Sequence, residues 1–283
     1  MLTSLVRLAV PNDHQQISNL IFFEPRLHRH LDWRSPLDWL GASFYWALDD
    51  GRHISAALAC PEEVPGIAWL RLFVHASGWT AEAAWEPLWQ TAQQDIARAG
   101  GAQVAVIAMQ AWFQRLLNGA GFENRQGIVL LEWQYQPWGR REAGGVRIRR
   151  MTEADLSEVQ QVDEAAFAPL WQNSLETLRR AYGQSVLATV ALADERIVGY
   201  QLSTGGGQRA HLARLAVRPE MQGRGVGQTL VNDLFSHMVN NGVYKVSVNT
   251  QSDNATSLRL YQRLGFVRTG EQFPVYLFDV SAL

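Results

Sequence analysis

The chain has 283 residues, with 25 lysines and arginines against 27 aspartates and glutamates and a net charge of −2. This balance gives no indication of nucleic acid or an anionic membrane as a partner. Hydrophobic residues make up 47% of the chain and charged residues 18%, which is typical of a globular protein and excludes a disordered one. The length predicts two domains, each large enough to bury its own core.

The single cysteine, Cys60, excludes an internal disulfide and fits a reducing compartment. Residues 1–10 carry Arg7 inside a short apolar run and no small-residue cleavage site, so they do not resemble a signal peptide. No apolar stretch approaches the length of a membrane span. We therefore expect a cytoplasmic protein that binds no membrane, and the sequence leaves its oligomeric state open.

The first half of the chain predicts an alternating strand at residues 6–8 and then a helical run through residues 17–21. Residues 136–145 are rich in glycine and charge and lack hydrophobic periodicity, which is typical of a domain boundary. The plan then starts again, with an alternating strand at residues 146–150. We predict a first domain at residues 1–138, a linker at 139–145 and a second domain at 146–283.

Later in the chain the apolar periodicity predicts a strand, a helix, a second strand and a second helix, at residues 212–217, 226–238, 243–248 and 255–264. The two halves of the chain also match at a nearly constant offset. Residues 71–74 match residues 214–217, which lie 143 positions later, and residues 121–122 match residues 265–266, which lie 144 positions later. A repeat of this length indicates a duplicated domain.

A glycine-rich run from Gln222 to Gly227 joins the predicted strand to the helix that follows it. Three glycines in five positions leave backbone N–H groups uncovered at the positive end of a helix dipole, which suits a phosphate or pyrophosphate group. The spacing fits neither a P-loop, which needs a lysine where Gln228 stands, nor a G-x-G-x-x-G turn, which needs a glycine at Gln228 or Leu230. A glycine-rich turn without a ligand is the alternative.

The pattern that remains, Q-x-x-G-x-G after a strand, resembles the acetyl-CoA loop of the GNAT acetyltransferase superfamily. The segment from Asn254 to Phe266, N-x-x-S-L-R-L-Y-Q-R-L-G-F, resembles the second signature of that superfamily. The resemblance implies an α/β (α+β) fold of two tandem GNAT-like domains, each with a mixed, mostly antiparallel sheet flanked by helices. The motif helix resembles those of enzymes that acetylate protein N-termini, whereas the tandem layout resembles small-molecule acyltransferases, so the acceptor stays open.

The resemblance implies acetyl-CoA as co-substrate and no metal. Backbone N–H groups of the glycine-rich run would meet the pyrophosphate, and Arg224 would either add a charged contact or remain solvated. The pantetheine arm would lie along the preceding strand, and a backbone N–H near Val217 would polarise the thioester carbonyl. The expected cofactor-binding residues are Leu215, Ala216, Val217, Gln222, Gly223, Arg224, Gly225, Val226, Gly227, Gln228 and Asn254.

Tyr261 is the expected catalytic residue, because a phenol can protonate coenzyme A as it leaves as a thiolate. A tyrosine on an apolar helix face is otherwise a packing residue. The general base is not assigned: some relatives use a carboxylate at the position where Asn249 stands here. His211, Asp163, Glu164 and an ordered water remain as alternatives.

The first domain lacks these features, so we expect it to bind no acetyl-CoA by this route. Residues 79–84, which correspond to the glycine-rich run, contain no glycine, and Leu117 stands where the second domain has its tyrosine. Ten of the eleven tryptophans precede residue 139; they either fill a core and an interdomain contact or line an aromatic pocket. The histidines at 14, 28, 30 and 53 have no cysteine or carboxylate frame for a metal.

The predicted function is an acetyl-CoA-dependent N-acetyltransferase that moves an acetyl group to a primary amine of a small molecule, protein or peptide. The amine would attack directly, with Tyr261 as general acid. One alternative is a non-catalytic acyl-CoA-binding regulatory module, which the missing carboxylate at Asn249 motivates. Another is a protein-interaction scaffold with vestigial sites, which the tryptophan-rich first domain motivates.

Overall fold

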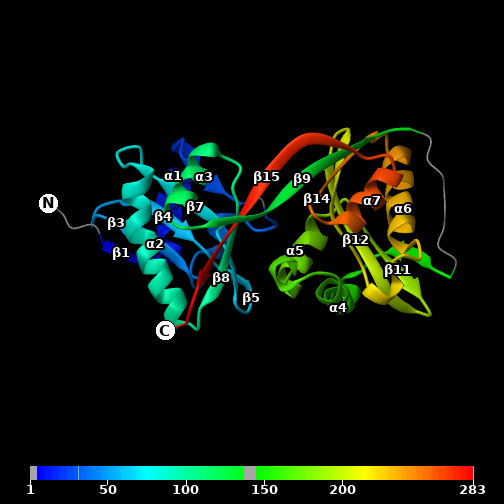
Figure 1. Ribbon diagram of the computed structural model, residues 1–283, viewed down its shortest axis with the longest axis horizontal. Coiled ribbons are helices and arrows are strands. Elements are labelled where there is room, and N and C mark those ends of the chain that lie inside the picture. Colours follow the sequence, from blue (N-terminus) through cyan, green and yellow to red (C-terminus); the bar gives the residue numbers. More distant parts are fainter. Residues whose placement is uncertain (1–4, 31, 137–144, 283) are drawn as a thin grey trace. The chain divides into compact units, whose positions relative to one another are not determined.

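The computed structural model describes residues 5–30, 32–136 and 145–282, which form two compact units (Figure 1). Unit 1 comprises Met1–Arg125 and Pro274–Leu283, and unit 2 comprises Gln126–Phe273. Strands β9 (Glu123–Gln134) and β15 (Val267–Val280) therefore each have residues in both units. The expected linker at residues 139–145 lies, apart from Gly145, outside the described residues.

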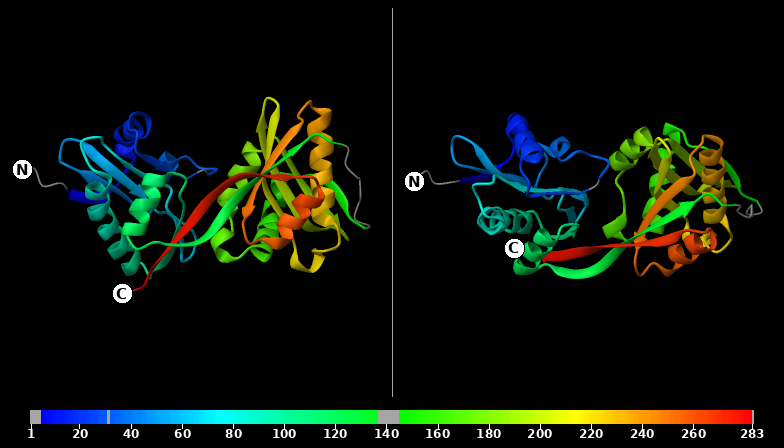
Figure 2. Two further views of the ribbon diagram at one scale, coloured as in Figure 1. Left: turned by 45° about the horizontal axis from the view of Figure 1, so that its top comes forward. Right: turned by 90° about the horizontal axis from the view of Figure 1, so that it is seen from above.

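Unit 2 contains a mixed, mostly antiparallel sheet in the order β10-β11-β12-β13-β14-β9, in which only β13 and β14 pair in parallel. The strands are β10 (Arg147–Arg150), β11 (Leu187–Ala193), β12 (Arg196–Gly206), β13 (Arg209–Val217) and β14 (Lys245–Gln251). Figure 2 shows α4 (Leu156–Ala166) and α5 (Leu175–Gln184) on one face, and α6 (Val226–Asn240) and α7 (Ala255–Arg263) on the other.

The core of unit 2 lies between the sheet and α6. Alternate residues of the central strands face the helix, among them Leu212 and Val248, which are both 1% exposed. Trp133 of β9 stacks on Phe235 of α6 with ring centroids 4.0 Å apart. The apolar residues, which recur every two residues along the strands and every 3.6 residues along the helix, thus form one buried layer.

The parallel pair of β13 and β14 is short. Arg209–Leu212 pair with Lys245–Val248, and beyond Leu212 strand β13 pairs with β12 alone among the described residues. A bulge marks this point, because Ser203 of β12 pairs with Leu212 whereas Leu202 pairs with Arg214, leaving Ala213 unpaired. The two strands therefore splay apart, and residues 214–217 of β13 form an open edge that we call the β13 edge.

The described part of unit 1 repeats this plan with α1 (His14–Phe23), α2 (Ala81–Arg98) and α3 (Ala111–Gly119). One sheet has the order β1-β3-β4-β7-β2, and the end of β15 pairs with β8, which is followed by β6 and β5 as the last strands of the ten-stranded sheet. Their strands are β1 (Leu5–Leu8), β2 (Leu27–Arg29), β3 (Tyr45–Asp49), β4 (Ile54–Ala59), β5 (Glu62–Val64), β6 (Ile67–Trp69), β7 (Leu72–His75) and β8 (Ala102–Ile107). β6 pairs with β8 in parallel, and the chain then leaves β8 and pairs with β4 as β7.

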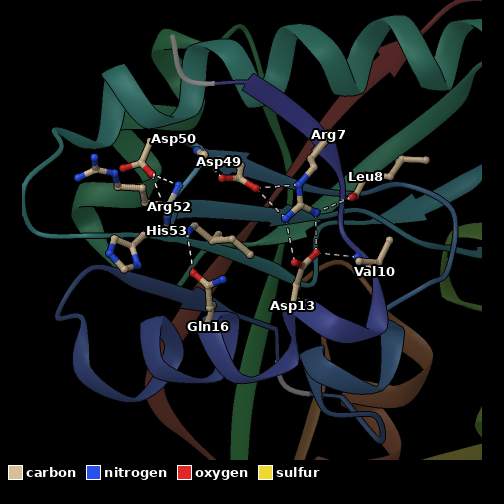
Figure 3. A network of polar contacts seen from close by, with 11 residues as sticks. Arg7, Leu8, Val10, Asp13, Gln16, Asp49, Asp50, Arg52 and His53 are labelled. Carbon is tan, nitrogen blue, oxygen red and sulfur yellow. Dashed lines mark hydrogen bonds and ion pairs between the residues drawn. The ribbon is translucent and has the colours of Figure 1, made fainter. Parts of the chain in front are cut away.

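A polar network near the start of each unit supports the duplication. Figure 3 shows Arg7 donating to both carboxylate oxygens of Asp13, at 2.7 and 2.8 Å, while the backbone N–H of Val10 also donates to this carboxylate. In unit 2 the guanidinium of Arg149 binds Asp155 at the same two distances. Each acidic residue lies 142 positions from its counterpart, close to the offset that the sequence shows.

Most of the early tryptophans are core residues. Six of the ten that precede residue 139 are buried, namely Trp39, Trp46, Trp69, Trp85, Trp89 and Trp133, and Trp138 lies outside the described residues. Trp85 stacks on Trp89 and contacts Phe73 edge to face. Packing thus accounts for these six side chains, without an aromatic pocket.

Candidate active site

The glycine-rich run forms the turn that starts α6. Gly223 has a φ of +75° and Gly225, the N-cap residue of the helix, has a φ of +87°, a region that side chains other than glycine rarely adopt. The six N–H groups from Gly223 to Gln228 donate to no acceptor among the described residues. A row of unpaired donors at a helix N-terminus is suited to an anion such as a pyrophosphate, so this turn fits the expected group.

Gly227 serves a different purpose from the other two glycines. A Cβ atom at this position would lie 3.2 Å from Cδ2 of Leu260 in α7 and 3.7 Å from Cγ2 of Val217. The missing side chain lets the first turn of α6 approach both α7 and the end of β13. Gly223 and Gly225 therefore give the loop its backbone shape, whereas Gly227 gives it close packing.

The β13 edge presents backbone donors away from β12. The N–H of Arg218, directly after β13, donates to the carbonyl of Val198 in β12 at 2.9 Å. Because N–H directions alternate along a strand, those of Val217 and Leu215 face the open side. The carbonyl of Val217 accepts a hydrogen bond from Nε2 of Gln222 at 3.0 Å, which ties the glycine-rich run to the strand. An extended ligand can add to this edge like another strand.

The corresponding edge of unit 1 is already occupied. Leu72, Phe73 and Val74 of β7 match Leu215, Ala216 and Val217, and they pair with β2 of the same unit. β2 is anchored there by His28, which is fully buried and stacks on Phe113 with ring centroids 4.3 Å apart. The segment that replaces the glycine-rich run opens α2, where the Thr80 side chain caps the N–H of Ala83. Unit 1 therefore has no open edge at this position.

Tyr261 lies on α7 and is 4% exposed. Its ring contacts Phe266 edge to face, with centroids 5.4 Å apart. Burial raises the pKa of the phenol above its usual value, so the hydroxyl keeps its proton at neutral pH. A neutral phenol in such a place can donate a proton to a leaving group that becomes negative.

Asn254 is the N-cap residue of α7. Its Oδ1 accepts a hydrogen bond from the N–H of Ser257 at 3.0 Å, and its Nδ2 lies 3.4 Å from Oε1 of Gln251. The capping role accounts for an asparagine here, because this side chain satisfies a donor that the helix leaves unpaired. The side chain is therefore already engaged by its own helix.

Asp163 belongs to a buried structural network. The carboxylate is fully buried and accepts two hydrogen bonds of 2.8 Å from the guanidinium of Arg214, together with one from the hydroxyl of Tyr200. Arg214 also donates to the carbonyl of Trp171 at 2.6 Å, which fixes the segment between α4 and α5. Burial and the charge of Asp163 raise the pKa of Tyr200 well above its usual value. Sequence reasoning missed this network, although Arg214 has a counterpart in Arg71.

Three further positions bear on the choice of a general base. Glu164 is exposed and accepts a hydrogen bond from Gln160 at 2.8 Å. Asn249 is exposed on β14, next to the point where the strands splay. His211 of β13 is half-buried, and its Nδ1 lies 2.9 Å from Oγ of Ser247 on β14.

Among residues 5–30, 32–136 and 145–282 no three histidine, cysteine, aspartate or glutamate side chains come together in a way that could hold a metal ion. No helix in these ranges is long and apolar enough to span a membrane.

Comparisons with known proteins agree with this geometry. Residues 154–266 match the model of the acetyltransferase (GNAT) family. Over 116 residues, 41% of this chain and 77% of the other, the chain is 28% identical to the [ribosomal protein bS18]-alanine N-acetyltransferase of Salmonella typhimurium.

Two solved structures are similar over both units of the chain. A GCN5-related N-acetyltransferase from Sphaerobacter thermophilus has a TM-score of 0.62 at 16% identity, covering 99% of this chain and 97% of that one. A tandem GNAT protein from the clavulanic acid biosynthesis pathway has a TM-score of 0.64 at 14% identity, covering 99% and 100%. These likenesses confirm the expected tandem α/β fold.

Proposed function

Because this chain is an acyltransferase of the GNAT family with a tandem fold, we propose that unit 2 is an acetyl-CoA-dependent N-acetyltransferase acting on a primary amine. The observation that carries the proposal is the pairing of two features in one unit. Six unpaired backbone donors start α6, and the adjacent β13 edge is open. Unit 1 has neither feature at the corresponding positions.

Unit 2 would bind the co-substrate mainly through backbone groups of the protein. The N–H groups of residues 223–228 would bind the pyrophosphate, and those of Leu215 and Val217 would bind the pantetheine arm and the carbonyl oxygen. Acetyl-CoA, when bound, supplies a thioester whose acetyl group is activated for transfer to an amine. Asn254 would contact the arm only with atoms that its capping role leaves available.

Tyr261 is the proposed general acid. Its hydroxyl would donate a proton to the departing sulfur. Burial raises the pKa of the phenol, so the hydroxyl already carries this proton before the reaction. The amine would attack directly, without an acyl-enzyme intermediate. The single cysteine of the chain, Cys60, is fully buried in unit 1 and is unsuited to carry an acetyl group.

The relative from Salmonella typhimurium acts on an alanine of ribosomal protein bS18, which makes an α-amine of a peptide a natural first acceptor to test. A small-molecule amine is the second class, and a cytoplasmic location remains a prediction from the sequence. The comparisons do not favour the alternative of a non-catalytic acyl-CoA-binding module, which the missing carboxylate at Asn249 motivates.

Release of free thiol from acetyl-CoA tests the proposal. The acceptors are a peptide with an N-terminal alanine, the same peptide with a blocked N-terminus, and glucosamine. We expect turnover with at least one free amine and none with the blocked peptide, and a fall of about 100-fold or more in Tyr261→Phe. A Tm raised by acetyl-CoA, with no thiol release on a broad amine panel, would instead favour the binding module.

A further inference from the structure

The face of the unit 2 sheet opposite α6 carries several ionisable groups near the point where β13 and β14 splay. Most are paired with each other. Lys245 binds Glu132 at 2.7 Å, which lowers the pKa of that carboxyl, and Arg214 binds Asp163. His211 is different, because its Nε2 makes no polar contact with the described residues.

The imidazole of His211 is held in one orientation by Ser247. The two residues face each other across the parallel pair, one position before the pairing ends, and Nδ1 lies 2.9 Å from Oγ. The same Oγ lies 3.4 Å from the carbonyl oxygen of Ala210, which can only accept a hydrogen bond. The serine hydroxyl therefore donates to Ala210 and accepts from Nδ1–H of the imidazole.

This chain of contacts leaves the lone pair on Nε2. Partial burial also lowers the pKa of His211, so the ring is neutral at neutral pH. Asn249 lies two positions beyond Ser247 on β14, on the same face. A neutral base thus stands beside the position at which the sequence resemblance leads one to expect a carboxylate.

Building on the proposed acetyltransferase function, we propose that His211 is the general base of the reaction and that Ser247 is its positioning residue. Nε2 takes the proton that the ammonium group loses, and the freed lone pair of the amine forms the new C–N bond. As the C–S bond breaks, the proton of Tyr261 goes to the sulfur. The nitrogen of the adduct still carries one proton too many and gives it to the phenolate of Tyr261, and the imidazolium then loses its proton to water.

The imidazole can be observed in the free protein, without co-substrate. Nitrogen-15 NMR distinguishes a ring protonated at Nδ1 from one protonated at Nε2. We expect the Nδ1–H form for His211 in the wild type and a mixture shifted toward Nε2–H in Ser247→Ala. An Nε2–H ring in the wild type, or a ring unchanged by Ser247→Ala, contradicts the inference.

Kinetics with the N-terminal alanine peptide give the second readout. We expect kcat to fall about 100-fold or more in His211→Gln and by a smaller factor in Ser247→Ala, with little change in the acetyl-CoA-induced rise in Tm. His237→Gln is the matched control, since this half-exposed histidine of α6 contacts Arg150. Full activity of a folded His211→Gln protein would overturn the assignment.

The pH profile separates a base from a structural residue. Because burial lowers the pKa of His211, the kcat of the wild type should fall at a more acidic pH than a free imidazole would give, since a protonated ring accepts no proton, and His211→Gln should lack this limb. The charged groups that share this face are Arg209 and the pairs Lys245–Glu132 and Arg214–Asp163. If the wild type turns over no amine, the proposed function fails together with this inference, whereas an active His211→Gln protein removes the inference alone.

Discussion

Units 1 and 2 share a parallel strand pair that splays, but they differ at the edge that the splay exposes. In unit 2 the β13 edge is open and leads into a turn with six unpaired N–H groups. In unit 1 strand β2 pairs with the corresponding edge, and a threonine side chain caps the helix that follows. The same segment of backbone is thus open in unit 2 and covered by another strand in unit 1.

The difference teaches that binding capacity in this fold depends on a few local residues. Both copies keep an arginine beside the splay, Arg71 and Arg214, and each of these is paired with buried carboxylates. The arginine pairs that stabilise each unit internally are therefore common to both, whereas the open edge and the unpaired turn occur, among the described residues, in unit 2 alone. Variants of matched positions can test this division.

The largest expected effect follows from removing either arginine. Arg214→Met removes the ion pair of the buried Asp163, and Arg71→Met removes the ion pairs that Arg71 makes with Asp32 and Glu63, so each should lower the free energy of unfolding by about 3–5 kcal/mol. Denaturation in urea measures the loss. A cost below about 1 kcal/mol in either variant would show that the shared arginines do not stabilise the two units alike.

The repeated Arg–Asp network should produce a smaller loss that depends on pH. The Arg149 guanidinium lowers the pKa of Asp155 to about 2, so its contribution is complete above pH 4 and disappears as the pH falls toward 2. We expect about 1–2 kcal/mol, less than a fully buried pair would give, because the Arg149 side chain is 34% exposed. Stability measured from pH 5 to 2 should lose this slope in Asp155→Asn.

Asp13→Asn is the matched change in unit 1, where Arg7 also lowers the pKa of the carboxyl. A similar loss of acid sensitivity would extend the likeness of the two units to their electrostatics. If Asp13→Asn leaves the pH dependence intact, the networks match in geometry but not in energy.

The helix caps should separate stability from binding. Thr80→Ala removes the side-chain cap of α2 and should cost about 1 kcal/mol of unfolding free energy. The Tm shift caused by acetyl-CoA should stay the same, because the turn before α2 offers no site. Loss of this shift in Thr80→Ala would mean that unit 1 takes part in binding.

The smallest effect is expected for Gly227→Ala. The added methyl group would lie 3.2 Å from the end of the Leu260 side chain, which can move, so the change in unfolding free energy should stay within about 1 kcal/mol. Affinity for acetyl-CoA should fall less than in variants of the left-handed Gly225. Equal losses of affinity at the two positions would contradict the separate purposes of these glycines.

Much of the fold follows from the sequence, because the elements of unit 2 have long and strongly periodic segments. The tandem arrangement was likewise predictable from the constant offset between the halves. Strand β2 was not predictable, because its three residues have no hydrophobic pattern of their own and pair with a strand more than 40 positions later. The division of β9 and β15 between the units also depends on distant partners.

The expected site residues differ in how far the sequence predicts their structural surroundings. Gly223 and Gly225 show a backbone requirement that is readable from spacing alone, and the structure gives these two residues the left-handed conformation that this requires. The pairing of Asp163 with Arg214 joins residues 51 positions apart, so no local pattern could reveal that this carboxylate is engaged. The binding and catalytic roles of the site residues stay predictions.

The stoichiometry of acetyl-CoA binding tests the central claim most directly. Isothermal titration of the full chain should give one site per chain, and Gly225→Val should abolish it, because valine at a φ of +87° distorts the turn. Glu82→Val, the corresponding change in unit 1, should leave both affinity and stoichiometry unchanged. Two sites per chain, or one site that survives in Gly225→Val, would contradict the assignment of a single acetyl-CoA site to the turn from Gln222 to Gly227.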